Sequence, residues 1–145
     1  MRRTFKAHGN DYSSLFELEF AKDLIKRGIP FHYEEFPIKY YLEPRTGKCM
    51  NCGGTDIVIE HIYWPDFYLK EHNLYIETKG KFSAKDRTKI LSVIRDNPWL
   101  DLRLIFMRDN WLTRKHVTKY SDWCKQNNIQ YSFLFMPDEW IKPCP

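Results

Sequence analysis

Long hydrophobic runs are missing from this 145-residue sequence, and so are internal repeats and low-complexity linkers. No apolar stretch approaches the ~20 residues that a membrane-spanning helix requires, so we expect no such helix. The N-terminal stretch MRRTFKAHGNDYSS is basic but lacks the apolar segment of a signal peptide. We therefore expect an intracellular protein that is not secreted and has no membrane partner.

Cysteine is also scarce, with four residues at positions 49, 52, 124 and 144. A chain of this length can bury a sufficient core without disulfides, so we expect reduced thiols and consider a metal role only for the close pair. The sequence is instead rich in aromatic residues, at 17%, and in charged residues, at 29%. The net charge of +4 permits binding to nucleic acid without requiring it.

The hydrophobic pattern predicts the order helix, strands, helix, strand, helix, strand. Ser14 and Glu17 have the spacing of a capping box, so the first helix should begin there, run to about Arg27 and end at Gly28. Further helices are expected at 84–97 and 117–127. Strands are expected at 57–63, 66–69, 74–79, 102–107 and 130–135. This order predicts a single α/β domain over residues 1–145, with a mixed central sheet flanked by helices.

Three segments fall outside this regular pattern. Residues 1–12 are expected to form a flexible basic arm. The aromatic segment 31–42 should be extended, and Pro37 within it indicates an edge strand or an exposed arm. Residues 43–56 contain proline, glycine and the two close cysteines, so we expect an inserted loop.

The stretch YWPDFYLKEHNLYIETKGK at 63–81 carries the first chemical signal. Strand alternation places Glu77 and Lys79 on one face, and a hairpin would bring Asp66 beside Glu77. Neighbouring carboxylates repel each other unless a cation lies between them, and Mg²⁺ prefers such oxygen ligands. Lys79 then suits phosphodiester cleavage, in which it would orient water or stabilise charge at phosphorus. The alternative is a solvated hairpin with an ordinary Glu–Lys pair.

Glu17 provides an independent signal in the first helix. It lies on or beside the apolar stripe formed by Phe20, Ala21 and Leu24. A buried carboxylate needs a partner. Glu17 would find one either in a capping box with Ser14 or as a further ligand in the acidic cluster, and these two roles are compatible.

Several motifs occur in one order along most of the chain. They are GIPFHYEEF at 28–36, PDF at 65–67, ETKG at 77–80, KDRTKILSVIRDNPWLDLRLIF at 85–106 and CKQNNIQYSF at 124–133. Together with the helix that carries Glu17, they resemble the endonuclease I family of T-odd bacteriophages. That family comprises Holliday junction resolvases of the PD-(D/E)xK nuclease superfamily.

The resemblance implies a restriction-endonuclease-like fold and metal-dependent cleavage of four-way junctions and other branched DNA. It implies Glu17, Asp66, Glu77 and Lys79 as catalytic residues. Mg²⁺, with Mn²⁺ as a substitute, would be held by Asp66, Glu77, Glu17 and the Thr78 backbone carbonyl. It further implies a domain-swapped homodimer in which Glu17 of one chain joins the other three residues of its partner, with 36–42 as the bridging strand. The setting would be the host cytoplasm.

The segment CMNCGG departs from the family pattern. Cys49 and Cys52 have the spacing of a zinc knuckle, but only half of a four-cysteine site is present. Three interpretations remain: an ordinary surface loop, Zn²⁺ bound together with His61 or another histidine, or a site that two chains complete with one pair each.

Basic residues are candidates for DNA phosphate contacts, which position DNA without reading its sequence. Lys85, Arg87 and Lys89 are favoured because they follow closely on the catalytic strand, although a solvated helix face is the alternative. The full set is Arg2, Arg3, Lys6, Lys81, Lys85, Arg87, Lys89, Arg114 and Lys115. Two other functions stay open: a restriction-like or repair nuclease acting on linear duplex, and a non-catalytic, zinc-containing DNA-binding module.

Overall fold

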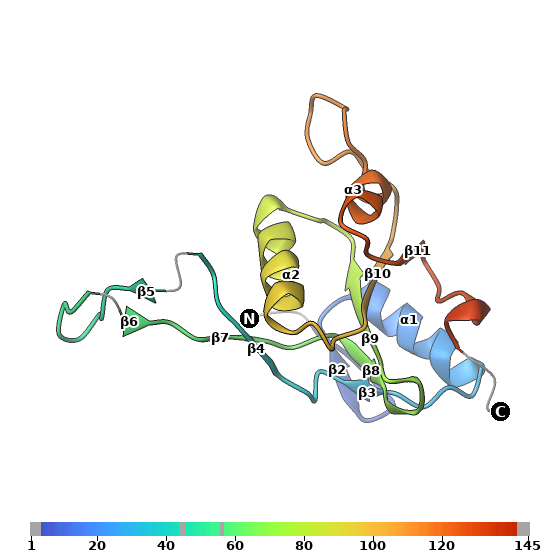
Figure 1. Ribbon diagram of the computed structural model, residues 1–145. Coiled ribbons are helices and arrows are strands. Elements are labelled where there is room, and N and C mark those ends of the chain that lie inside the picture. Colours follow the sequence, from blue (N-terminus) through green and yellow to red (C-terminus); the bar gives the residue numbers. More distant parts are fainter. Residues whose placement is uncertain (1–3, 44–45, 56, 142–145) are drawn as a thin grey trace.

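A five-stranded mixed sheet forms the centre of the computed structural model, which describes residues 4–43, 46–55 and 57–141 (Figure 1). The strand order is β11-β10-β9-β8-β3. Strands β9, β10 and β11 run parallel, whereas β8 is antiparallel to both of its neighbours, β9 and β3. These strands are β3 (His32–Tyr33), β8 (Phe67–Leu69), β9 (Leu74–Lys79), β10 (Leu102–Phe106) and β11 (Tyr131–Phe133). The predicted α/β class with a mixed central sheet is confirmed.

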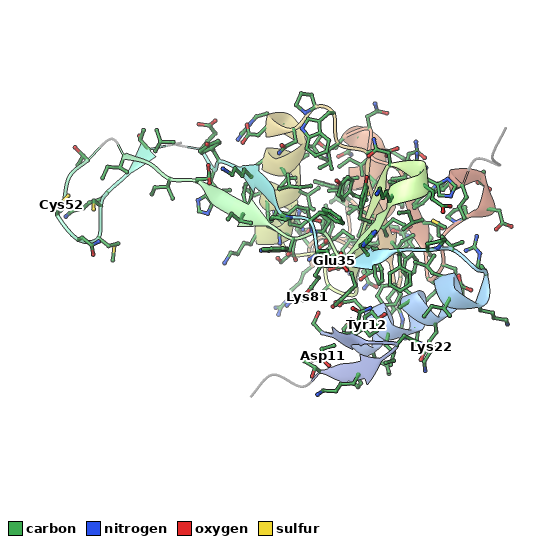
Figure 2. All side chains as sticks on the ribbon, turned by 90° about the horizontal axis from the view of Figure 1, so that it is seen from below. Asp11, Tyr12, Lys22, Glu35, Cys52 and Lys81 are labelled. Atoms are coloured by element: carbon green, nitrogen blue, oxygen red, sulfur yellow. The ribbon has the colours of Figure 1, made fainter. Side chains whose placement is uncertain are left out.

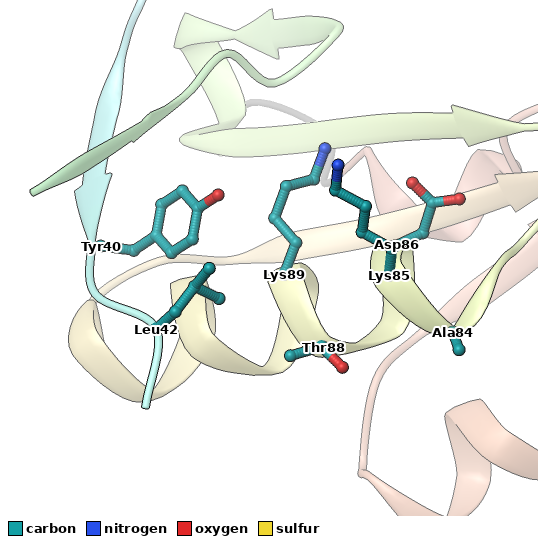
Figure 3. A pocket seen from close by; sticks show the side chains of 7 residues that line it. All are labelled: Tyr40, Leu42, Ala84, Lys85, Asp86, Thr88 and Lys89. Atoms are coloured by element: carbon teal, nitrogen blue, oxygen red, sulfur yellow. The ribbon is translucent and has the colours of Figure 1, made fainter. Parts of the chain in front are cut away.

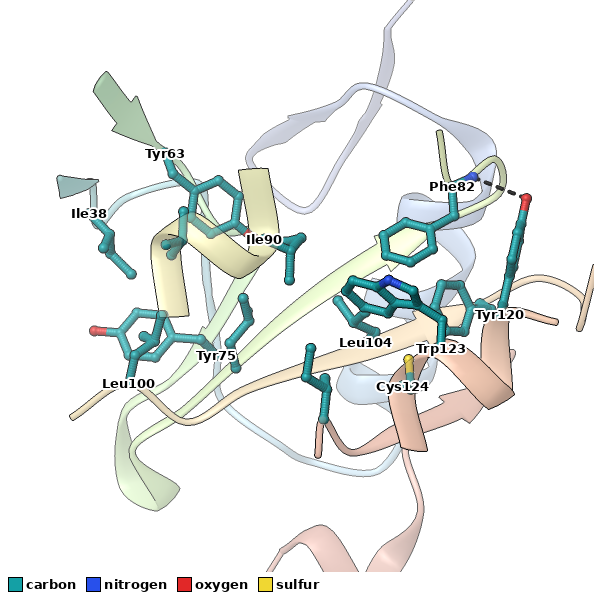
Figure 4. Close-up of a cluster of buried hydrophobic side chains, with 14 of the residues drawn as sticks. Ile38, Tyr63, Tyr75, Phe82, Ile90, Leu100, Leu104, Tyr120, Trp123 and Cys124 are labelled. Carbon is teal, nitrogen blue, oxygen red and sulfur yellow. Dashed lines mark hydrogen bonds between the residues drawn. The ribbon is translucent and has the colours of Figure 1, made fainter. Parts of the chain in front are cut away.

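Helices cover both faces of this sheet. Phe20 and Leu24 of α1 (Leu15–Lys26) share one buried cluster with Ile76 of β9. Ile90 of α2 (Ala84–Asp96) shares the other cluster with Tyr75. In that second cluster, α3 (Tyr120–Gln126) packs its aromatic residues against Phe82 (Figure 4). The two faces of β9 alternate as predicted, but both are buried, because each face has its own helices.

The ends of α1 follow from local chemistry. The Ser14 side chain accepts a hydrogen bond from the Glu17 backbone N–H at 3.1 Å, which confirms the predicted start. Gly28 adopts a left-handed φ of +69°, and the Ile29 N–H donates to the Leu24 carbonyl at 2.9 Å. Glycine at such a position ends a helix without steric cost, which confirms the predicted stop.

A two-stranded ribbon projects from the body between β3 and β8 (Figure 1). At its base, β4 (Ile38–Tyr40) pairs with β7 (His61–Tyr63). Further out, β5 (Thr46–Gly47) pairs with β6 (Ile57–Val58). The expected strand at 57–63 is therefore two short strands. The expected loop at 43–56 is, in its described part, a paired ribbon with a turn at the tip, where Cys52 lies (Figure 2).

The expectation of a flexible arm at 1–12 is corrected for the residues that the structure describes. Strands β1 (Phe5–Ala7) and β2 (Asn10–Tyr12) form a hairpin, because His8 and Gly9 both adopt positive φ in the two-residue turn. The Tyr12 ring is fully buried and lies 4.6 Å from the Tyr33 ring, measured between centroids.

Two smaller differences concern the C-terminal half. The helix expected at 117–127 begins at Tyr120, because Lys119 is extended and forms a β-bridge with Trp111. Short 3₁₀ turns at η1 (Lys70–His72) and η2 (Asp138–Trp140) were not expected as helices. Among the described residues, no helix has the length and apolar character needed to cross a lipid bilayer.

Candidate active site

The four residues that the sequence singled out come together at one end of the central sheet. Glu17 projects from α1, Asp66 immediately precedes β8, and Glu77 and Lys79 lie near the end of β9. The three acidic residues are buried, with 8%, 7% and 4% of their surface exposed for Glu17, Asp66 and Glu77. A solvated hairpin would leave these carboxylates in water, so that interpretation is wrong.

Asp66 lies between the other two acids. Both the backbone N–H and the hydroxyl of Thr78 donate to its Oδ2 at 2.8 Å. Burial raises the pKa of Asp66 well above its usual range, and the charges of Glu77 and Glu17 raise it further, whereas the Thr78 hydrogen bonds act in the opposite direction. The Thr78 contacts found here are donor contacts, so a ligand role for its carbonyl stays a prediction. A cation close to Asp66 would favour its charged form.

Glu17 takes part in the helix start in modified form and lies in the acidic cluster, whereas its role as a metal ligand stays a prediction. Its backbone N–H is capped by Ser14, but its carboxylate does not return to the Ser14 backbone as a full capping box would require. It instead accepts hydrogen bonds from the Ser13 hydroxyl, at 2.9 and 2.8 Å to its two oxygens, and from the Tyr33 hydroxyl. These donors hold the carboxylate beside Asp66.

Glu34 is a further candidate site residue, which the sequence pattern did not single out. Glu17, Glu34 and Asp66 each offer a carboxylate oxygen, and these oxygens all lie within 4.8 Å of one another. Glu34 has a φ of +48°, which is uncommon for glutamate, and its N–H donates to the Asp66 carbonyl at 3.0 Å. Such conformations are often held at functional sites. The only sequence signal was its place in the YEE motif, because a left-handed glutamate has no signature in hydrophobic periodicity.

Lys79 supplies the positive charge. Its Nζ lies 3.1 Å from Glu77 Oε1 and 3.3 Å from Asp86 Oδ1. Burial alone would favour the neutral amine, but the Glu77 and Asp86 carboxylates outweigh that effect and raise the pKa of Lys79. The side chain is therefore an ammonium donor at neutral pH and not a general base.

Two further residues, Tyr63 and Asp86, position the Glu77–Lys79 pair. The buried Tyr63 hydroxyl donates to Glu77 Oε2 at 2.5 Å, which leaves Oε1 for Lys79. Asp86 belongs to the capping box of α2, in which Ser83 and Asp86 exchange hydrogen bonds, so it ties Lys79 to the helix start. The S-x-x-D spacing at 83–86 was a detectable signal for Asp86. No sequence signal pointed to Tyr63, because its role depends on the pairing of β4 with β7 in the ribbon.

A groove of about 590 Å³ opens between α2 and the ribbon base, next to these residues (Figure 3). It reaches the site through Asp86, and the Lys89 Nζ lies 5.2 Å from the centroid of the Tyr63 ring. Two of the predicted DNA contacts, Lys85 and Lys89, belong to its wall. The lining residues are Tyr40, Leu42, Ala84, Lys85, Asp86, Thr88 and Lys89.

The other predicted DNA contacts are more scattered. The Arg87 guanidinium donates to the Phe82 carbonyl at 2.8 Å, so it has a structural role at the start of α2. Lys6 and Lys81 are exposed on β1 and after β9, respectively. Arg114 and Lys115 are exposed in the connection from β10 to α3. Arg2 and Arg3 lie outside the described residues.

The cysteine pair is remote from this site. Cys49 and Cys52 lie at the ribbon tip, whereas His61 lies on β7 at the base, with its ring 5.3 Å from that of Tyr40. Within the described ranges, no histidine, aspartate or glutamate joins the two sulfurs in a group of three close ligands. The structure therefore does not bring His61 to the thiols.

Comparison with known proteins identifies relatives that match most of the chain. The family model for phage endonuclease I matches residues 1–144. Endonuclease I of Escherichia phage T7 is 30% identical over 132 residues, which cover 90% of this chain and 78% of that protein. Endodeoxyribonuclease 1 of Enterobacteria phage T3 is 31% identical over 135 residues, which cover 92% of this chain and 79% of that protein.

Proposed function

Because the chain belongs to the phage endonuclease I family, we propose that it is a structure-selective DNA endonuclease that cleaves four-way junctions and other branched DNA by metal-dependent phosphodiester hydrolysis. The observation that carries this proposal is the convergence of three buried carboxylates and one ammonium group at one end of the sheet. The T3 relative is named an endodeoxyribonuclease, which supports DNA as the substrate class.

The residues present fit a divalent metal ion. Glu17, Glu34 and Asp66 offer an all-oxygen donor set of the kind that Mg²⁺ prefers, and Glu77 lies beside it. The raised pKa of Asp66 shows that these charges are costly without a cation. A bound Mg²⁺ would supply Lewis acidity toward a phosphoryl oxygen and a more acidic water. Mn²⁺, which accepts similar ligands, would substitute.

Lys79 contributes to catalysis as a fixed cation. Its salt bridges to Glu77 and Asp86 hold the ammonium group at the edge of the acidic cluster. From there it can donate a hydrogen bond that orients the attacking water, or it can stabilise the charge that develops on the phosphate. Tyr63 fixes Glu77 and thereby sets the direction in which Lys79 points.

The groove along α2 would receive the DNA backbone. Lys85 and Lys89 lie in its wall and are close to Asp86, so a phosphate bound there would be adjacent to the catalytic residues. Such contacts do not depend on base sequence, which suits an enzyme that recognises DNA shape. Binding should weaken steeply as the salt concentration rises.

Two such sites would act together in a homodimer with exchanged α1 helices. In a single chain, Glu17 lies beside Asp66 of the same chain, and an exchange would form the same contact between two chains. The segment 34–37 is exposed and links β3 to β4, so it could open as the hinge, and β4 would then be the bridging strand. Glu34, with its positive φ, begins that hinge.

Mixing Glu17→Ala chains with Asp66→Ala chains tests the exchange. In an exchanged heterodimer one site carries both substitutions and the other carries none, so nicking activity should return. Verified heterodimers that stay inactive would place each site within a single chain.

Cleavage of an immobile four-way junction, compared with linear duplex of the same sequence, tests the proposed function itself. We expect paired nicks in the junction with Mg²⁺, no cleavage in EDTA, and an intact linear duplex. Equal cleavage of both substrates would instead identify a restriction-like or repair nuclease. Junction binding without cleavage at any Mg²⁺ concentration would identify a non-catalytic DNA-binding module.

A further inference from the structure

The turn at the ribbon tip is organised around the sulfur of Cys49. The Cys49 N–H donates to the Gly54 carbonyl at 2.8 Å, and the Gly53 N–H donates to the Cys49 carbonyl at 2.9 Å. Gly53 has a φ of +71°, which closes the turn in a conformation that other residues rarely adopt. The backbone N–H groups of Asn51 and Cys52 donate to the Cys49 sulfur. These contacts fix the position of the Cys49 sulfur within the turn, three residues from Cys52.

The sulfur of Cys52 is also accessible. Cys52 is exposed, and a Cβ atom at position 54 would lie only 3.4 Å from its Sγ. Glycine at this position therefore leaves space beside the sulfur. In addition, Lys48 is exposed next to the two thiols along the chain. The tip thus presents two sulfur ligands and a nearby positive charge.

Two ligands do not complete a structural zinc site, which is almost always four-coordinate. No third histidine, cysteine, aspartate or glutamate approaches the pair within the part of the chain that the structure describes. The ribbon also carries the tip away from the body, so side chains of the sheet and helices are remote from it (Figures 1 and 2). Among the described residues the pair is therefore incomplete, and a second copy of the chain is a source of two further sulfur ligands.

We propose that Cys49 and Cys52 bind Zn²⁺ together with the same two residues of a second copy of this chain, which forms a four-thiolate site between two ribbon tips. A second copy supplies two further thiolates in the same turn, so the closed, all-sulfur set that Zn²⁺ favours results from symmetry alone. This proposal is independent of the nuclease activity.

The surroundings of the tip suit contact between two copies. A Zn²⁺ ion with four thiolates carries a net charge of −2, and the Lys48 side chains of the two chains would balance it. Apolar side chains that solvent reaches on the ribbon would become covered. They include Met50, which is 97% exposed, and Val58, which is 61% exposed.

Zinc content of the full-length protein, purified under reducing conditions in the presence of Zn²⁺, tests this site. We expect one Zn²⁺ per two chains, retained in a complex of two chains observed by native mass spectrometry. Cys49→Ser and Cys52→Ser should each reduce the zinc content to below about a tenth, since each removes two of four ligands from the assembled site. Replacement with Co²⁺ should give the strong charge-transfer absorption of four thiolates per metal ion.

Two control variants separate this site from other sources of zinc. Cys124→Ala removes a thiol that is buried in α3 and should leave the zinc content unchanged. His61→Ala should also retain zinc, and loss of zinc in that variant would identify His61 as a ligand and overturn the proposal. One Zn²⁺ per single chain, a Co²⁺ spectrum with only two thiolates, or absence of bound zinc would overturn it as well. None of these measurements uses DNA. Their outcome is therefore independent of the outcome of the nuclease assay.

Discussion

The acidic cluster of the body and the thiol pair of the ribbon tip are built in opposite ways. The cluster draws on α1, the β3–β4 segment, β8 and β9, which packing brings together within one chain. The tip is a turn of six residues, and its hydrogen bonds are nearly all internal to it. The cluster is assembled by the fold, whereas the tip is formed by local sequence and offers two sulfur atoms.

This difference also determines how each region is stabilised. The buried core around α1 and β9 holds Glu17, Asp66 and Glu77 close together despite their mutual repulsion. Such strain is common where function requires charge to be concentrated. The tip has almost no buried surface, so a metal or a partner would provide its order. The two regions also select different ions, because carboxylates prefer hard cations and thiolates prefer Zn²⁺.

The largest expected effect is loss of cleavage from changes in the body. Glu77→Ala and Lys79→Ala should each reduce junction cleavage by ~10²-fold or more, the scale for removing a group that stabilises a transition state. Both variants should still bind the junction in a gel-shift assay. Lys70→Ala, an exposed lysine in η1, is the matched control and should cleave normally. Full activity in either site variant would contradict the assignment.

A smaller effect is expected for the residue that only the structure revealed. Glu34→Gln keeps the size of the side chain but removes its charge, so the Mg²⁺ concentration for half-maximal cleavage should rise by ~10-fold, the lower end for altered metal sites. Glu35→Gln is the control, because Glu35 pairs instead with His32, at 2.9 Å from its Nδ1. Equal Mg²⁺ requirements in the two variants would exclude Glu34 as a ligand.

Asp66 gives a stability prediction whose sign depends on pH. Its pKa is raised in the folded protein, so the charged form destabilises the fold. That cost is absent below the pKa of the unfolded chain, near 4, grows as the pH rises above it, and levels off once the pH exceeds the folded-state pKa. In metal-free protein at pH 8, Asp66→Asn should therefore increase the free energy of unfolding by on the order of 1 kcal/mol.

Denaturant unfolding at several pH values measures this effect. The gain in the free energy of unfolding of Asp66→Asn should disappear near pH 4, where Asp66 is protonated in both the folded and the unfolded state. Added Mg²⁺ should stabilise the wild-type protein more than the variant. A variant that is less stable than wild type at pH 8 in EDTA would show that the Thr78 hydrogen bonds outweigh the repulsion.

The smallest effect is expected at the tip. In EDTA, Cys49→Ser and Cys52→Ser should change the free energy of unfolding by less than ~0.5 kcal/mol, as is usual for surface substitutions. When Zn²⁺ is added in the same assay, it should increase the free energy of unfolding of the wild-type protein only. A large loss of stability in EDTA would show that the tip packs against the body and would remove the contrast between the two regions.

The sequence predicted most of what depends on short segments. The start and stop of α1, the strand β9 and the helix α2 follow from capping residues, alternation and periodicity. The convergence of Asp66, Glu77 and Lys79 followed from strand alternation and a hairpin. Glu34 and Tyr63 could not be found in this way, because one depends on a left-handed backbone and the other on pairing between β4 and β7. The buried state of Glu77 was also missed, since a single strand does not reveal that helices cover both of its faces.

Anomalous diffraction from crystals grown with Mn²⁺ and Zn²⁺, with data collected at both absorption edges, tests the contrast between the two regions most directly. A manganese signal is expected among the carboxylates of Glu17, Glu34 and Asp66, and a zinc signal between two ribbon tips at Cys49 and Cys52. Absence of manganese from the acidic cluster, in protein that cleaves junctions in Mn²⁺, would contradict the proposed catalytic metal site.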